Sequence, residues 1–240
     1  MIQLLIYQSF LHLRMASTYV MLGFIALSVW LLGRAPVGLG SGLFAVQITS
    51  MLSIWITVTF FVQLSAFHQV FFRSEALQYR LARLRNRSMV IGAGLIHITL
   101  LAFVASLPYA VLYFGLVDDH RLALLSWGNV LLFHVYLGMA AALLLRWLGS
   151  NGITTLILLL VLFMLPLSVD GLLGMMHSVA NHPVVSAIVD LLRSHLDVFG
   201  NPDMLLLRGI QDTDALLRTL ILTPILATTT YVLFLRGDHH

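Results

Sequence analysis

The stretch MVIGAGLIHITLLAFVASLPYAVLYFGLV, residues 89–117, contains no Asp, Glu, Lys or Arg. A helix needs about 20 apolar residues to cross roughly 30 Å of hydrocarbon, so this stretch is long enough to cross a bilayer. The stretch contains a single histidine, His97, and a single proline, Pro108. We therefore predict that residues 89–117 form a membrane-spanning helix.

The rest of the chain has the same character. Of its 240 residues, 60% are hydrophobic and 10% are charged, whereas soluble domains have about 45–50% apolar and about 25% charged residues. A soluble fold of this size has no room to hide so much apolar surface. The composition predicts an all-α integral membrane protein with a single transmembrane domain over residues 1–240.

Six apolar runs suit membrane spans. Residues 1–15 are less hydrophobic and suit an interfacial helix lying on the membrane, or else an extension of the first span. Residues 170–215 contain short apolar runs that suit extracytoplasmic half-helices between spans five and six. The predicted spans cover about residues 17–33, 43–72, 89–117, 122–145, 153–169 and 216–235.

The cationic side chains are unevenly distributed. All 13 of them are Arg, and five lie between spans two and three against the single acid Glu75. The loops of the other side hold most of the Asp residues. By the positive-inside rule, we expect a multi-pass protein of the inner (cytoplasmic) membrane with both termini cytoplasmic. The arginines of the predicted cytoplasmic side are Arg14, Arg73, Arg80, Arg83, Arg85, Arg87, Arg146 and Arg236.

Several chemistries are excluded by residue types that the chain lacks. Without Cys it has no disulfide, thiol catalysis or cysteine metal site. Without Lys it has no Walker A loop and no Schiff-base chemistry. It contains no G-x-S-x-G motif and no H-E-x-x-H motif. We therefore expect no catalytic residues, no metal site and no nucleic-acid partner.

The most distinctive segment is FRSEALQYRLARLRNRS, residues 72–88. Its leucines and its arginines recur at helical spacing on two different faces, which predicts a short amphipathic cytoplasmic helix. An alternative is an arginine-rich loop that sets topology and contacts lipid phosphates. The leucines are Leu77, Leu81 and Leu84, and the arginines of the other face are Arg80, Arg83 and Arg87.

This organisation resembles the ABC-2-type transporter permeases, the membrane subunits of ABC exporters. Glu75, the spaced leucines after it and the direct entry into the next span at Met89 carry the resemblance. The interfacial helix, the six spans and the long segment before the last span agree with it. Gln78 stands where that family often has Gly, so the subfamily and the substrate stay open.

The resemblance implies a permease that pairs as a homodimer within membrane lipid and exports an unidentified substrate. A separate cytoplasmic ABC ATPase subunit would hold ATP and Mg, and this chain would hold no cofactor. ATP binding would shift the permease between inward-open and outward-open states. The coupling helix that docks on the ATPase would contain Glu75, Leu77, Arg80, Leu81, Arg83, Leu84 and Arg87.

Polar residues within the spans are candidates for lining the transport path. In the permease interpretation these are Gln47 and Gln63 of span two, with His97 and His134 of spans three and four. The alternative for each is hydrogen bonding between neighbouring helices.

The intramembrane histidines also support a different class, a haem-binding membrane anchor of an electron-transfer complex. Two imidazoles that face each other across helices can ligate a haem iron. His68 lies one turn from the cytoplasmic end, so only His97 and His134 could approach one level. A non-transporting membrane assembly factor is a third class. The small residues that would make room for a haem are Gly92, Gly94 and Gly138.

Overall fold

The computed structural model describes residues 15–34, 41–71, 87–148, 157 and 213–236. These residues form helices and no strands, which confirms the predicted all-helical class for this part of the chain. The helices are α2 (Ala16–Leu32), α3 (Ser41–Phe71), α5 (Arg87–Leu116), α6 (His120–Leu148) and α11 (Thr213–Arg236).

Each of these five helices begins and ends within three residues of a predicted span. Three contain stretches long and apolar enough to cross a membrane, namely Met51–Gln69, Ser88–Leu116 and His120–Leu145. Helices α2 and α11 contribute shorter apolar stretches, Ala16–Leu32 and Leu220–Leu233. The predictions that lie outside the described residues are the interfacial helix at 1–15, most of the coupling helix at 75–88, the span at 153–169 and the half-helices within 170–215.

A short turn makes α5 and α6 antiparallel neighbours. The carboxylate of Asp119 caps α6, since its Oδ1 accepts hydrogen bonds from the backbone N–H groups of Arg121 at 2.9 Å and Leu122 at 3.2 Å. Such a cap satisfies donors that the first turn of a helix leaves free. Only residues 117–119 separate the two helices, so α6 folds directly back along α5.

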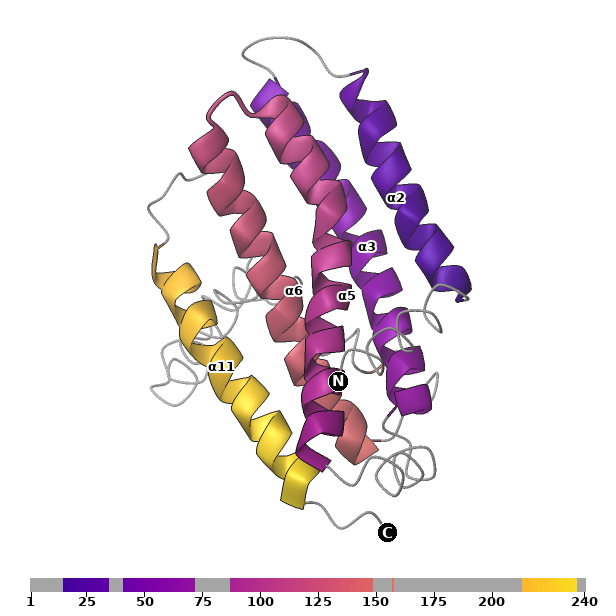
Figure 1. Cartoon of the computed structure of the whole chain (residues 1–240). Coiled ribbons are helices and arrows are strands. Elements are labelled where there is room, and N and C mark those ends of the chain that lie inside the picture. The colour runs from indigo at the N-terminus through magenta and orange to yellow at the C-terminus, as the bar shows by residue number, and fades with distance from the viewer. Residues whose placement is uncertain (1–14, 35–40, 72–86, 149–156, 158–212, 237–240) are drawn as a thin grey trace, which may run out of the picture.

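Helix α5 is the centre of the bundle, because it packs against α2, α3, α6 and α11. In Figure 1, α2 and α5 run in one direction and α3, α6 and α11 run in the other. Helices α6 and α11 are therefore parallel.

The core lies where α3, α5 and α6 meet. Its largest fully buried side chains include Phe60 on α3 and Tyr109 and Tyr113 on α5. Gly138 on α6 permits the close approach. A Cβ atom at that position would lie 2.7 Å from Cγ2 of Ile98 and 3.1 Å from Cζ of Phe60. Three helices therefore close on one another at Gly138.

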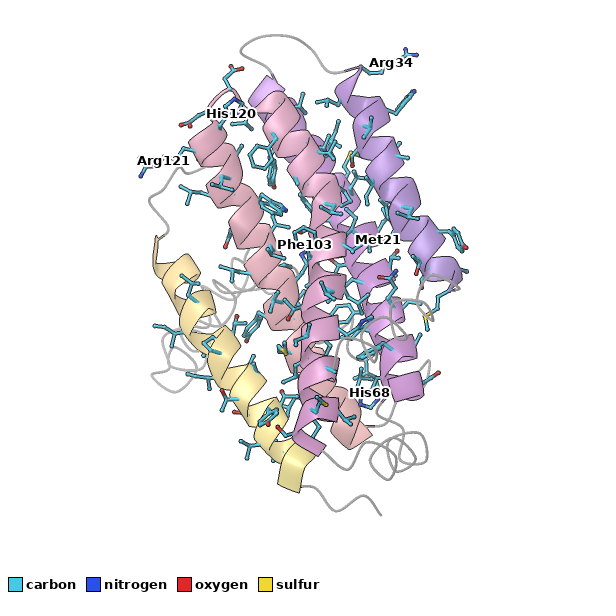
Figure 2. The ribbon with its side chains drawn as sticks, in the orientation of Figure 1. Met21, Arg34, His68, Phe103, His120 and Arg121 are labelled. Atoms are coloured by element: carbon cyan, nitrogen blue, oxygen red, sulfur yellow. The ribbon has the colours of Figure 1, made fainter. Side chains whose placement is uncertain are left out.

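The two ends of the bundle differ in charge. Arg87 begins α5, Arg146 lies in the last turn of α6, and Arg236 ends α11, all at the same end of the bundle. Figure 2 shows Arg34 and Arg121 at the opposite end, where the guanidinium of Arg34 lies 5.4 Å from the centre of the Trp30 ring. The end with three helix-terminal arginines is the one predicted to face the cytoplasm.

Candidate functional site

Helix α3 carries an unusual number of polar side chains into the core. In its second half Thr57, Thr59, Gln63, Ser65 and His68 are all buried. This part of α3 packs against α5 and α6. Polar groups are costly at membrane depth unless they find a hydrogen-bond partner, so their pairing indicates what each one does.

The threonines and the glutamine among these residues differ in how their side chains are paired. The hydroxyl of Thr59 donates to the carbonyl of Trp55 at 2.8 Å, within its own helix. By contrast, Oγ1 of Thr57 and Oε1 of Gln63 are buried and have no hydrogen-bond partner. A buried polar atom without a partner costs about 1–3 kcal/mol relative to one that is paired. Each such atom therefore needs an explanation beyond helix packing.

His134 presents the third unsatisfied atom of this region. It lies at the middle of α6 and is 0% exposed. Its Nδ1–H donates to the carbonyl of Val130 at 2.8 Å. That bond sets the tautomer, so Nε2 carries a lone pair and acts as an acceptor. This Nε2 atom is buried and has no hydrogen-bond partner.

Aromatic rings from three helices surround the His134 imidazole. The ring of Phe60 on α3 lies edge-on at 5.5 Å, and Phe133 on α6 lies edge-on at 5.6 Å. The ring of Tyr109 on α5 lies at 5.9 Å. His134 therefore occupies the meeting point of α3, α5 and α6.

The two unsatisfied residues of α3 lie on either side of this level, about 9 Å apart along the helix axis. Thr57 and Gln63 are each three residues from Phe60, which corresponds to about 4.5 Å along the helix axis, and Phe60 contacts His134. We name Thr57 Oγ1, Gln63 Oε1 and His134 Nε2 the core polar cluster. The structure thus brings two predicted path residues, Gln63 and His134, to neighbouring levels of one three-helix core.

His97 lies at a different level. Its ring stacks on Phe67 with centroids 4.5 Å apart. Phe67 is seven residues beyond Phe60, about 10.5 Å further along α3. The aromatic neighbours of His97 and His134 on α3 are therefore about two turns apart. Gln47, the fourth predicted path residue, belongs to α3, and its side chain lies outside the described residues.

The same geometry bears on the haem interpretation. Gly138, one of the glycines expected to make room for a haem, is the point where Phe60 and Ile98 close against α6. Within residues 15–34, 41–71, 87–148 and 213–236, no group of three or more His, Asp or Glu side chains is placed to hold a metal ion. In the described packing, the space beside Gly138 is filled by side chains of α3 and α5.

The predicted coupling helix meets the described structure at one end. Arg87 and Ser88, which close the predicted amphipathic segment, are the first two residues of α5. The hydroxyl of Ser88 is hydrogen-bonded to the phenol of Tyr231 on α11. The remaining coupling residues, Glu75, Leu77, Arg80, Leu81, Arg83 and Leu84, lie outside the described residues.

One set of polar groups between α5 and α6 is paired, which sets it apart from the cluster. The indole N–H of Trp127 donates to Oγ of Ser106 at 3.1 Å, and that hydroxyl donates to the carbonyl of Phe103 at 2.7 Å. These bonds hold α5 and α6 together.

Two features of the site are not predicted by the sequence patterns above. Ser126, whose buried Oγ also lacks a partner, precedes His134 by two steps of four residues on α6. That spacing was the available signal, because residues four apart share a helix face. Phe60 gave no signal, since one ring among many apolar residues in α3 is not distinguished by the sequence.

Comparison of this chain with protein-family models, with curated proteins and with solved structures finds no match.

Proposed function

We propose that this chain is the permease subunit of an ATP-driven exporter, of the ABC-2 type, that works as a homodimer with a separate cytoplasmic ATPase. The observation that carries the proposal is the position of the arginine-rich segment. Helix α3 ends at Phe71 and α5 begins at Arg87, at the end of the bundle where Arg146 and Arg236 also lie.

This position suits a docking element. Fifteen residues, 72–86, connect two long apolar helices at the arginine-rich end. Guanidinium groups pair well with carboxylates of a partner protein, and a leucine face can pack into an apolar groove. An ATPase that binds there would contact the connection between two membrane helices.

The packing of α5 supports the coupling step. A displacement of the segment before Arg87 would act first on α5, which contacts all four other described helices. The hydrogen bond between Ser88 and Tyr231 joins the start of α5 to α11. In the proposed cycle, the two ATPases close when they bind ATP. Their closure shifts the equilibrium between a bundle in which α3 and α6 are packed together and one in which they are separated.

Purification with mass spectrometry tests the proposal. We expect the tagged full chain, extracted gently from its native membranes, to retain a stoichiometric ATPase that contains a Walker A loop. The double variant Glu75→Lys with Leu81→Asp should lose that partner, whereas Arg121→Ala, at the opposite end, should keep it. Recovery of the chain alone, or with redox subunits and a Soret absorbance band, would reject the permease interpretation.

The absence of cysteine allows a clean test of orientation. In intact cells, a membrane-impermeant maleimide should label the single-cysteine variant Arg121→Cys and should not label Arg80→Cys until the cells are opened. The opposite pattern would reverse the proposed topology, and with it the access of a cytoplasmic ATPase to residues 72–86.

A further inference from the structure

The core polar cluster has a defined hydrogen-bonding character. Nε2 of His134 and Oε1 of Gln63 are acceptors, and the hydroxyl of Thr57 can donate or accept. All three side chains are at most 1% exposed, and none of the three atoms has a hydrogen-bond partner. No Asp, Glu or Arg is buried in the described parts of the helices. The cluster therefore offers acceptors without any fixed charge.

The missing partner must supply hydrogen-bond donors. A carboxylate or phosphate would bring further acceptors into a region with no cation to balance them, and burying such a charge is very costly. A hydroxyl or a neutral amino group donates hydrogen bonds and complements two acceptors without bringing a charge into the core. The chemistry of the cluster thus selects donor-bearing groups and disfavours anions.

The surroundings define the rest of the ligand. The rings of Phe60, Phe133 and Tyr109 lie around His134, so everything beyond the donor group meets apolar or aromatic surface. In the packed state Gly138 lets Phe60 and Ile98 close on α6. A ligand therefore reaches Nε2 only when α3 and α6 separate.

We propose that Thr57, Gln63 and His134 form a binding site for an amphipathic molecule that presents a hydroxyl or neutral amino group on an apolar body. This proposal rests on the proposed function in one respect, because in an exporter the molecule bound at this site is the exported cargo. Binding itself requires no ATPase, so the site and the transport activity can be tested separately.

Photolabelling of the full chain in lipid nanodiscs tests the site. Three probes of equal length carry a diazirine next to the headgroup: a fatty alcohol, a fatty amine and a fatty acid. The alcohol and the amine should label peptides of α3 and α6 around Phe60 and His134. The fatty acid should label only lipid-facing positions such as Met51 and Trp55, which are 73% and 63% exposed.

Variants identify the groups responsible. His134→Leu should reduce core labelling by the alcohol about tenfold, the effect expected for one hydrogen bond. Thr57→Val, which preserves shape, should reduce it as well and serves if His134→Leu fails to fold. The matched control is Thr59→Val, because the Thr59 hydroxyl is already bonded to the Trp55 carbonyl; its labelling should be unchanged.

Three results would overturn the binding site. The first is equal core labelling by all three probes, and the second is core labelling that His134→Leu and Thr57→Val leave unchanged. The third is labelling confined to lipid-facing residues, which would mean that only water meets the cluster. Specific core labelling in a chain that purifies without an ATPase would support the site and reject the exporter. A bound ATPase without core labelling would support the exporter and reject the site.

Discussion

Helices α2 and α3 are both free of charged residues and differ in how their side chains are buried. Neither contains an Asp, Glu, Lys or Arg residue, and both match predicted spans. Helix α2 buries only Met21 and Ser28, and the Ser28 hydroxyl donates to the Phe24 carbonyl at 2.9 Å. Helix α3 buries several polar side chains, of which Thr57 and Gln63 have an unsatisfied atom.

This difference in burial between α2 and α3 shows which properties of a membrane helix can be predicted from hydropathy and which cannot. Length and apolar content decide whether a helix can cross the bilayer. Helix α3 contains a stretch that meets both conditions, Met51–Gln69, whereas α2 is a shorter apolar helix of 17 residues. Packing decides which face meets lipid and which meets protein, and lipid and protein interiors are about equally apolar. A peripheral helix and a core helix can therefore both lack charged residues while only one of them carries unsatisfied polar atoms.

The largest expected effect comes from removing a core ring. Phe60→Ala should lower the free energy of unfolding by about 3 kcal/mol, the low end for a core Phe, because lipid solvates apolar groups well and mainly packing is lost. Tyr19→Ala on α2, where the side chain is 64% exposed, should change it by less than about 0.5 kcal/mol. Titration into dodecyl sulfate followed by circular dichroism measures both. Equal losses would remove the distinction between the helices.

The second largest expected difference between the core and α2 comes from adding side-chain volume at a glycine. Gly138→Val should cost about 1–3 kcal/mol, since its side chain would collide with Phe60 and Ile98 in a closed core. Gly23→Val on α2 is the matched change, because a Cβ there meets nothing within 4 Å. The same titration measures both variants. A tolerated Gly138→Val would show that α3, α5 and α6 do not close at this point.

Removal of an unsatisfied polar atom should stabilise the bundle. Thr57→Val should raise the free energy of unfolding by about 1 kcal/mol, because the buried hydroxyl has no partner. Ser28→Ala on α2 should be close to neutral, since that hydroxyl is bonded within its own helix. Destabilisation by Thr57→Val would mean that its hydroxyl is satisfied in the native membrane. Thermal unfolding in detergent is the measurement.

The smallest expected effect concerns the contact between α5 and α11. Tyr231→Phe removes the phenol that is hydrogen-bonded to Ser88 and should cost about 0.6 kcal/mol, the average for hydrogen bonds between membrane helices. Tyr19→Phe, an exposed phenol on α2, is the control and should show no change. If the two variants behave alike, the contact contributes nothing to stability, and its proposed part in coupling loses support.

Much of the described fold was predictable from the sequence, and the site was predictable only in part. Gln63 and His134 stood out because polar residues are rare in apolar runs, and both lie in the core. His97 stood out for the same reason, yet it stacks on Phe67, at another level of α3. Depth along a single helix does not give the tilt and offset of its neighbour, so residues on two helices cannot be aligned from sequence alone.

The sequence by itself determined that the chain enters a membrane, where its described helices begin and end to within a few residues, and which end of the bundle gathers arginine. These properties depend on local composition and on the length of apolar runs. Only the tertiary structure decided that α5 is central, that Gly138 brings three helices together, and that His134 lies beside Phe60, between the levels of Thr57 and Gln63. These depend on how side chains of distant segments interlock, and in lipid that packing is directed by shape and hydrogen bonding more than by hydropathy.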